Sequence, residues 1–507
     1  MAWLSGVLLG LAFLPAPLGF LAWVAFVPLL IALDRRLAAG EPIRSLFGVG
    51  YGFGLAFFLI GTHWIALLED VAITVPWLKY PAWLVAAAYL ALFPALASAL
   101  AGWLSRCSGR SLATTFPFAY LAVEVLRGSG ELGFPWFQPG YTQHAYLPIL
   151  QLASLGSVTL VTLWVLFVNV LLWRACVGGD QARGGRVRAG LGAALALALV
   201  WLWGLRVIQV PPAADRRPVV ALVQGNIPGE MKWSGQHQTE ILDRFLRLSD
   251  DAAHRTPRPA LVIWPETATG SYLRVQLDQR IAVAHLAAGT GVPVFSGFPD
   301  YGLDSLGHAR DWNAAGWFAV DGAVGPVYAK RHLVPLGERM PFQRWLPALG
   351  HIRLGQAEWT PGDRTVLFPT EAGPFSCLVC FESIFPELSR GDVRKGARWL
   401  VNITNDEWFG NSAALHQHAA MAVFRAVENH VPLARCANTG ITMMVDAKGR
   451  VVERLPILEA RVLSASLPPA GAPTLFTRVG DWPAWLAWLG VGVWAWGKHT
   501  RRDRGQR

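Results

Sequence analysis

Charged residues are scarce in this chain: they make up 15% of its 507 residues, whereas 53% are hydrophobic. Soluble domains carry about 25% charged residues, and the deficit here is uneven. Residues 1–210 form a series of apolar runs, residues 211–480 have the composition of an ordinary globular domain, and residues 481–507 hold one more apolar run and a basic tail. A wholly soluble protein is therefore excluded, and the sequence predicts transmembrane helices that flank one water-soluble domain.

Cysteine is scarce as well, with five residues in the chain, too few for a disulfide scaffold. Cys377 and Cys380 form a C-x-x-C pair, but side chains three apart on a strand point to opposite faces. A zinc site needs a second pair of ligands, and only Cys436 remains in the soluble domain. His416 and His418 are two residues apart, whereas ligands on one helix face are three or four apart. We therefore expect neither a metal nor another cofactor.

The net charge of +10 belongs mainly to the membrane segments. Residues 211–480 hold 27 Lys and Arg against 25 Asp and Glu, a net charge of only +2, so the other +8 lies in the apolar segments and the tail. A nucleic-acid-binding domain would carry the excess positive charge on its own surface. We expect no nucleic-acid partner, and we expect the basic tail to meet anionic lipid.

Eight apolar runs are candidates for transmembrane helices, because a bilayer core is crossed by about 20 apolar residues. With approximate ends, they are Ala2–Leu14, Leu18–Leu33, Leu46–Leu68, Trp83–Trp103, Leu112–Leu126, Leu147–Trp173, Leu191–Ile208 and Trp482–Trp496. The first run lacks a preceding basic segment and is followed at once by another run, so a signal peptide is not expected. Glu124, in the fifth run, is expected to have a structural role beside Arg127.

Basic residues in the loops between these runs predict the orientation. With the N-terminus inside the cell, the cytoplasmic loops and tail hold fourteen Lys and Arg residues, and the short outer loops hold only Lys79 and Arg127. Loops rich in Lys and Arg stay on the cytoplasmic side. We therefore expect both termini in the cytoplasm and the soluble domain on the outer face.

Short apolar segments alternate with amphipathic ones in the soluble domain. The expected strands include Val219–Val223, Leu261–Trp264, Pro293–Ser296, Gly316–Val320, Phe375–Cys380 and Trp399–Thr404, and the expected helices are Gln238–Ala253, Gln276–Ala288 and His416–Asn429. Asp321-Gly322 and Lys448-Gly449 predict hairpin turns between further strands. All-apolar strands are typical of a sheet covered on both faces, so we expect a layered α/β domain.

Three residues with complementary chemistry follow apolar strands of this domain. Glu266 comes directly after Trp264-Pro265. Lys330 follows Val327–Ala329, and Cys380 ends its own strand. A thiol becomes a good nucleophile when a base removes its proton, and a fixed cation stabilises the oxyanion of acyl transfer. Each residue alone would more often be structural, but together they predict an acyl-transfer site where strands of one sheet end.

The order and spacing of these residues, 64 and 50 positions apart, resemble the nitrilase superfamily, whose αββα sandwich carries a Glu-Lys-Cys triad. Two further strings resemble that superfamily, NITNDEWFG at Asn402–Gly410 and FRAVEN at Phe424–Asn429. With the flanking apolar runs, VQGNIP at Val223–Pro228 and MKW at Met231–Trp233, the chain resembles the bacterial apolipoprotein N-acyltransferases nearly from end to end.

This resemblance implies a two-step reaction in the bacterial inner membrane. Cys380 would attack an ester of a phospholipid, typically phosphatidylethanolamine, to give an acyl thioester. The α-amine of an S-diacylglyceryl cysteine on an apolipoprotein would then take the acyl chain as an amide. By the same resemblance, Glu266 would be the general base and Lys330 would stabilise the tetrahedral intermediates. We expect a monomer without a cofactor.

The resemblance also implies supporting residues around the triad. Glu338 corresponds to a second acidic residue that supports the triad, and Glu382 to another position of functional importance. Trp233 and Asn313 correspond to positions in the lipid-facing, substrate-binding site. Phe381 departs from the pattern, since many members have Tyr after the nucleophile, but its backbone N–H is still expected to serve as an oxyanion donor.

Two alternatives remain open at this point. The first is a membrane-anchored amidase of the nitrilase type that hydrolyses a small amide or nitrile, although such an enzyme has no need of eight helices. The second is a transporter or scaffold with an inactive outer domain, although the apolar runs hold few paired polar residues.

Overall fold

A computed structural model describes residues 1–70, 75–177, 183–209, 217–303, 307–343, 345–351 and 358–504. The chain forms two compact units. The first, the helical unit, comprises Met1–Leu67, Trp77–Val210 and Val479–Arg507. The second comprises Leu68–Pro76 and Pro211–Arg478, and we name it the outer unit after the position that the loop charges predict for it. The expected domain boundary at residue 211 and the last residues of the basic tail, 505–507, lie outside the described residues.

The helical unit is built from helices joined by short 3-10 turns. Its elements are α1 (Ala2–Ala12), η1 (Gly19–Trp23), α2 (Val27–Ala38), α3 (Ile43–Gly61), η2 (His63–Leu67), η4 (Pro76–Leu78), α4 (Lys79–Ser108), α5 (Leu112–Arg127), η5 (Pro135–Phe137), η6 (Pro139–Gln143), α6 (Leu147–Leu150), α7 (Ala153–Val177), α8 (Arg183–Val207) and α15 (Trp482–Arg504). The apolar runs of the sequence thus form helices, as their lengths predict.

Four helical segments of the described chain are long and apolar enough to cross a membrane, fewer than the eight runs expected. They are Ile43–Leu67, Pro76–Ser108, Ala153–Cys176 and Gly184–Val207. The helices α1, with 11 residues, and α5, with 16, are shorter than a bilayer core requires. The run Leu18–Leu33 is not one helix, because it is divided between η1 and α2. Apolar composition alone does not distinguish a membrane span from a short helix packed within a bundle.

Glu124 and Arg127 form a buried ion pair on α5, as expected for charged groups in an apolar helix. Their closest oxygen and nitrogen lie 2.5 Å apart, and both side chains are almost wholly buried. Arg127 also donates to the carbonyl oxygen of Phe134 at 2.5 Å. The pair therefore fixes the end of α5 to the chain that follows it.

The outer unit contains twelve described strands and six described α-helices. The strands are β1 (Val219–Gln224), β2 (Pro259–Ile263), β3 (Val294–Leu303), β4 (Ala309–Phe318), β5 (Val324–Ala329), β6 (Leu367–Phe368), β7 (Phe375–Val379), β8 (Trp399–Thr404), β9 (Leu433–Ala437), β10 (Met443–Val445), β11 (Val451–Arg454) and β12 (Arg461–Ser466). The helices are α9 (Gly229–Trp233), α10 (Gln238–Ala253), α11 (Leu277–Thr290), α12 (Pro386–Arg394), α13 (Ala413–Asn429) and α14 (Leu475–Val479), with the 3-10 turns η7 (Pro347–His351), η8 (Cys380–Ile384) and η9 (Asp406–Phe409).

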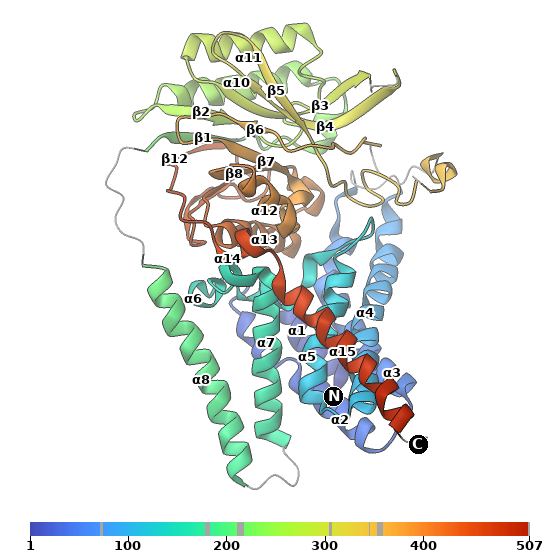
Figure 1. Ribbon diagram of the computed structural model, residues 1–507. Helices are drawn as coiled ribbons and strands as arrows, with labels where there is room; N and C mark the ends of the chain where they lie inside the picture. Colours follow the sequence, from blue (N-terminus) through green and yellow to red (C-terminus); the bar gives the residue numbers. More distant parts are fainter. Residues whose placement is uncertain are drawn as a thin grey trace. The chain divides into compact units, whose positions relative to one another are not determined.

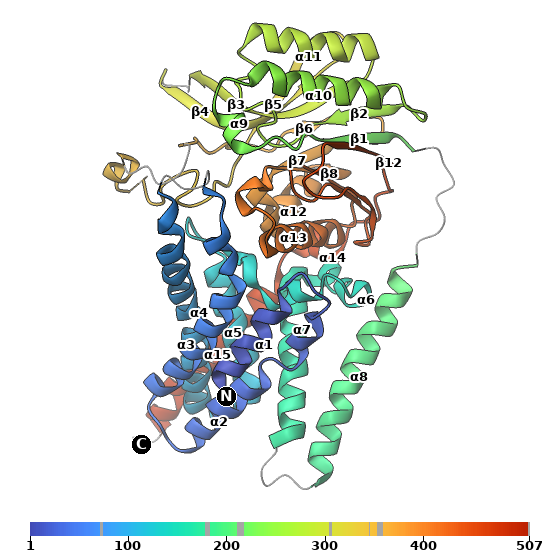
Figure 2. The ribbon, with the colours of Figure 1, turned by 180° about the vertical axis from the view of Figure 1, so that it is seen from behind.

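The strands form two six-stranded sheets. The first has the order β12-β1-β2-β3-β4-β5 and the second β11-β10-β9-β8-β7-β6. In each sheet three central strands are parallel, β1-β2-β3 and β7-β8-β9. Figures 1 and 2 show α10 and α11 over the first sheet and α12 and α13 over the second. The outer unit is therefore a layered αββα domain.

Strand alternation explains why both faces of each sheet are covered. Val220 and Leu222 of β1 belong to the core between the two sheets. Ala221 and Val223 point the other way and pack with Phe245 of α10. Successive side chains of a strand point to opposite faces, so an all-apolar strand requires a covering layer on each side. Both expected hairpins are confirmed, since β4 pairs with β5 and β10 with β11 in antiparallel fashion.

Candidate active site

The three predicted site residues follow β2, β5 and β7. The expectation that these strands belong to one sheet is wrong: β2 and β5 lie in the first sheet and β7 in the second. Glu266 and Lys330 are joined across the first sheet by a contact of 3.4 Å between Lys330 Nζ and Glu266 Oε1. Both of their charges act on the ionisation of Cys380, so the sandwich brings strand ends of two different sheets to one place.

Glu266 lies in a tight loop after β2 and is almost wholly buried. Its Oε1 accepts from Asn313 Nδ2 at 2.7 Å, and its Oε2 accepts from the backbone N–H of Asn405 at 2.7 Å. The loop passes so close to Gly297 of β3 that a Cβ there would lie 2.7 Å from the carbonyl oxygen of Pro265. A carboxylate offers about four acceptor positions, so Glu266 keeps room for one more proton donor.

Lys330 is buried between two carboxylates. Its ammonium group contacts Glu338 Oε1 at 2.8 Å as well as Glu266. Its backbone N–H donates to the carbonyl oxygen of Asn313 at 2.8 Å. Burial by itself lowers the pKa of Lys330, but Glu338 and Glu266 outweigh burial, and the net shift is upward. Lys330 is therefore a permanent cation at this site.

Cys380 is the first residue of the 3-10 turn η8, directly after β7. Its φ of +50° lies in the left-handed region that residues other than glycine rarely adopt, and such conformations concentrate at functional sites. The side chain is partly exposed. Burial raises the pKa of the thiol, Glu266 raises it further, and Lys330 opposes them. The sulfur is thus a protonated thiol at neutral pH.

Glu382 ties the two catalytic strand ends together from a fully buried position. Its carboxylate accepts from the backbone N–H groups of Arg331 at 2.7 Å and Val379 at 2.7 Å. It also accepts from the hydroxyl of Tyr328 at 2.8 Å. The residues beside Lys330 and beside Cys380 therefore share one acceptor, which fixes the distance between the cation and the nucleophile.

Asn313 and Glu338 extend the network around Lys330. Asn313 Nδ2 donates to both Glu266 Oε1 and Glu338 Oε1, the latter at 3.1 Å. Glu338 Oε2 accepts from the backbone N–H of Val334 at 2.8 Å. The structure thus places Asn313 between two carboxylates. A contact of Asn313 with substrate stays a prediction.

Two aromatic residues predicted for the site lie on separate elements. Trp233 ends α9, and its indole Nε1 is buried without a hydrogen-bond partner among the described residues. Phe381 is buried and packs edge-on against Phe385 with ring centroids 5.3 Å apart. The ring of His332 also packs against Phe385, tilted by 41° with the centroids 3.8 Å apart. This packing involves only the rings, so it does not need the hydroxyl group that a tyrosine at position 381 would carry.

The sequence did not single out Lys232, a second buried cation near Glu266. Its Nζ donates to Asn405 Oδ1 at 3.2 Å, and the backbone of that same Asn405 holds Glu266. Burial lowers the pKa of Lys232 to about 8, against the opposing charges of Glu407 and Glu266. Burial raises the pKa of Glu407 to about 6, and Lys232 opposes this shift. The signal available in the sequence was the position of Lys232 directly before Trp233.

A buried charge network supports the backbone of the nucleophile. His418 Nε2 lies 3.1 Å from the carbonyl oxygen of Cys380, and its Nδ1 lies 3.0 Å from Asp406 Oδ1. Arg435 contacts the other oxygen of Asp406 at 2.6 Å. The ligand atoms of Cys380, Asp406 and His418 come within 4.8 Å of one another. Because both ring nitrogens of His418 already have polar partners, this arrangement suits a structural link better than a metal site.

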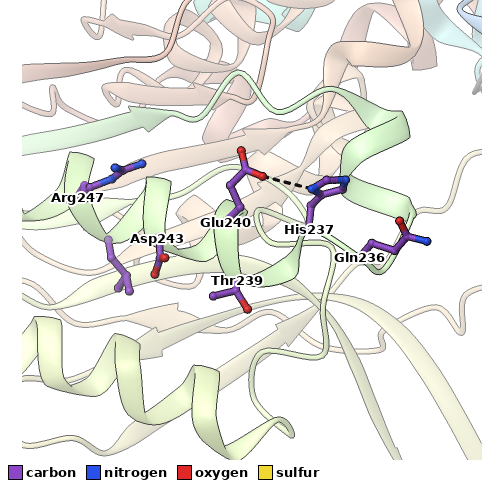
Figure 3. A pocket seen from close by; sticks show the side chains of 7 residues that line it. Gln236, His237, Thr239, Glu240, Asp243 and Arg247 are labelled. Carbon is purple, nitrogen blue, oxygen red and sulfur yellow. Dashed lines mark hydrogen bonds and ion pairs between the residues drawn. The ribbon is translucent and has the colours of Figure 1, made fainter.

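A cavity of about 630 Å³ lies along α10, apart from the residues described above. Its lining, shown in Figure 3, is Gln236, His237, Thr239, Glu240, Asp243, Leu246 and Arg247. His237 and Glu240 pair at 3.2 Å on its surface. The cavity has mixed charge and contains none of the predicted site residues, so it does not bear on the chemistry of the triad.

Comparisons with known proteins cover both parts of the chain. Residues 5–171 match the apolipoprotein N-acyltransferase N-terminal domain, and residues 219–473 match the carbon-nitrogen hydrolase family. Apolipoprotein N-acyltransferase of Geobacter metallireducens is 36% identical over 97% of this chain and 94% of its own length. The same enzyme of Methylococcus capsulatus is 34% identical over 96% and 93%. The solved structure of Saccharomyces cerevisiae Nit3, from branch 10 of the nitrilase superfamily, covers 51% of this chain and 93% of its own, at 22% identity and a TM-score of 0.39.

Proposed function

The chain belongs to the apolipoprotein N-acyltransferase family, and we propose that it transfers the acyl group through a thioester on Cys380. It is a membrane acyltransferase that N-acylates lipoproteins. The observation that carries the proposed mechanism is the buried contact of Lys330 with both Glu266 and Glu338 beside a thiol on a strained turn.

In the first step, the Cys380 sulfur attacks the ester carbonyl of a phospholipid, with phosphatidylethanolamine as the expected donor. Glu266 takes the thiol proton as the carbon–sulfur bond forms. The tetrahedral intermediate then collapses, the ester carbon–oxygen bond breaks, and Glu266 returns the proton to the leaving oxygen. The products are an acyl thioester on Cys380 and a lysophospholipid.

In the second step, the α-amine of the S-diacylglyceryl cysteine attacks the thioester carbonyl. The amine loses a proton to Glu266, the carbon–nitrogen bond forms, and the carbon–sulfur bond breaks. The proton passes to the departing sulfur and restores the thiol. One base thus serves both half-reactions, because in each of them the nucleophile loses one proton and the leaving group gains one.

The high pKa of Cys380 makes the base necessary. A resting thiolate would need no proton acceptor, but burial and Glu266 keep the sulfur protonated. Proton removal must therefore accompany attack, which is the role of a general base. Lys330 supplies the positive charge for the oxyanion, an effect worth about 3 kcal/mol in the transition state. Glu338 and Asn313 hold Lys330 and Glu266 in position.

The topology proposed for the enzyme follows the loop charges. Residues 1–210 would contribute the spans that precede the catalytic domain, among them the four long apolar segments, residues 211–480 the catalytic domain on the periplasmic face of the inner membrane, and residues 481–507 a last span and a cytoplasmic tail. Both substrates are diacyl lipids that remain in a bilayer, so a membrane-bound monomer with an outer catalytic domain meets them directly.

Mass spectrometry of the intact protein tests the thioester. The full chain is incubated with phosphatidylethanolamine and no acceptor, and we expect an acyl mass on the peptide containing Cys380 that hydroxylamine removes. Glu266→Gln and Lys330→Ala should abolish turnover, and Cys380→Ala should lose the adduct. Cys377→Ala is the matched control, because Cys377 lies in the core between the sheets and should keep the adduct.

Substantial acyl transfer by Cys380→Ala would rule out the covalent mechanism. Hydrolysis of a small amide without any acyl adduct from labelled phospholipid would instead favour a membrane-anchored amidase.

A further inference from the structure

A second cavity, of about 450 Å³, lies in the outer unit and includes none of the site residues described above. Its walls come from the end of α12, the turn before β8, the end of α13 and α14. Three arginines line it, Arg394, Arg398 and Arg478, and the lining contains no carboxylate. We call the hollow that these three arginines line the arginine cavity. Three positive charges in one hollow without an acidic neighbour create a strong local preference for an anion.

These three guanidinium groups are not used elsewhere in the described structure. Two nearby arginines already have acidic partners: Arg390 pairs with Glu387 at 3.0 Å, and Arg331 pairs with Asp392 at 2.8 Å. No ion pair joins Arg394, Arg398 or Arg478 to any described residue, and each is exposed. The three guanidinium groups of the arginine cavity can therefore bind an anionic ligand from outside the chain.

The wall formed by α14 is fixed in place by buried polar contacts. Arg390 Nε donates to the carbonyl oxygen of Phe476 at 2.9 Å. Thr477 Oγ1 donates to Asn429 Oδ1 at 3.0 Å, and both residues are buried at the base of the cavity. Arg478 is thus attached to a short helix anchored on α12 and α13. A preformed wall reduces the entropy that ligand binding costs.

Chain connectivity ties the arginine cavity to the start of α15. Only three residues separate Arg478 from Trp482, the first residue of α15, so their Cα atoms are at most about 14 Å apart. The outward side chains of α15 are large and apolar: Trp485 is 75% exposed and Leu489 63% exposed. Tryptophan on an apolar helix is typical of the membrane–water interface. If α15 crosses the membrane as proposed, Arg478 would lie at about the depth of lipid headgroups.

We propose that the arginine cavity binds the phosphate of an anionic phospholipid headgroup as a site separate from the acyl donor. Arginine suits this ligand because its planar fork donates two parallel hydrogen bonds to phosphate oxygens. Three arginines neutralise a headgroup that carries a full net negative charge, whereas the ammonium group of a zwitterionic lipid is repelled. The proposal rests on the proposed topology in that α15 crosses the membrane.

Native mass spectrometry of the detergent-solubilised full chain tests this site. The probes are dioleoylphosphatidylglycerol, dioleoylphosphatidylcholine and inorganic phosphate. We expect the wild type to retain phosphatidylglycerol in preference to phosphatidylcholine. The triple variant R394Q/R398Q/R478Q should retain it at least about tenfold less, since each basic residue at the membrane surface contributes a several-fold factor in affinity. The matched control R247Q/R258Q/R454Q removes three exposed arginines of the same unit and should bind as the wild type does.

Each other outcome has a defined meaning. Equal retention of phosphatidylglycerol by the triple variant and the control would overturn the proposal. Binding of inorganic phosphate without any preference for the anionic lipid would overturn the lipid assignment and leave a free-anion site. The thioester on Cys380 serves as an independent readout: it should form normally in the triple variant, so loss of lipid retention with an intact thioester separates this site from the catalytic mechanism.

Discussion

At the scale of single residues, Glu382 holds the chain segments of both the cation and the nucleophile in position. It accepts from Arg331 and Val379, which flank the cation and the nucleophile. In Glu382→Gln, one acceptor oxygen is replaced by an NH₂ group that cannot accept these bonds. We expect kcat to fall roughly 100-fold, the effect of a displacement of about 1 Å at a catalytic site.

The Glu382 prediction is checked by kcat, KM and the yield of the Cys380 adduct. Tyr328→Phe is the control, because it removes one hydroxyl donor and leaves both backbone bonds in place. Its kcat should fall much less. A Glu382→Gln protein that melts normally and retains full kcat would show that the carboxylate does not position the triad.

Lys232 gives a prediction about pH. Its pKa is about 8 in the fold against an ordinary value of 10.5, so folding disfavours its charged form. The stability that this group contributes is present above pH 10.5 and is lost as the pH falls to about 8, a difference of about 3 kcal/mol. In Lys232→Met this pH dependence disappears.

The measurement for Lys232 is the apparent melting temperature at pH 8 and pH 10. The wild type should gain stability relative to Lys232→Met as the pH rises. Lys395→Met, at an exposed lysine, should track the wild type at both pH values. If the difference between wild type and Lys232→Met stayed constant or shrank, burial would not be controlling this amine.

At the scale of elements, α5 shows the effect of a charge pair inside an apolar helix. Glu124→Gln leaves the buried Arg127 without its carboxylate. Removal of one partner of a buried pair costs about 3–5 kcal/mol, whereas replacement of both by apolar residues is often nearly neutral. We expect Glu124→Gln to lower the apparent melting temperature in detergent and Glu124→Met with Arg127→Met to recover most of it. A Glu124→Gln protein as stable as the wild type would contradict this.

The strand β9 illustrates why some elements escape prediction. Its sequence is LARCA, and Arg435 at its centre interrupts the apolar pattern. In the fold, Arg435 is fully buried and pairs with Asp406 at 2.6 Å. The partner that permits this burial lies 29 residues away. The local sequence pattern therefore indicates the end of a strand at Arg435, whereas in the fold Arg435 belongs to the charge network that supports the backbone of Cys380.

At the scale of the whole molecule, the loop charges predict which residues face outward. Thr239 is exposed on α10 of the outer unit, and Cys176 is exposed near the end of α7. A membrane-impermeant maleimide added to intact cells should label Thr239→Cys at once. It should label Cys176 only after permeabilisation. Peptide mass spectrometry gives both results from one protein, and the opposite pattern would reverse the proposed orientation.

The sequence by itself determined the elements whose signal is local. The period of α10, the apolar run of β8 and both hairpin turns are encoded within a few residues, so their limits follow from side-chain alternation and turn chemistry. The order Glu266, Lys330, Cys380 and the strings around them also identified the family before any fold was known.

Only the tertiary structure decided how the site is assembled. It placed Cys380 after a strand of the second sheet and Glu266 and Lys330 after strands of the first. It also brought Lys232 and Glu266 to Asn405 from 173 and 139 residues away. Such contacts depend on which faces of the two sheets pack together, and no local propensity encodes that choice. The structure likewise reduced eight apolar runs to four helical segments long and apolar enough to cross a membrane in the described chain, because apolar side chains serve equally well against lipid and against neighbouring helices.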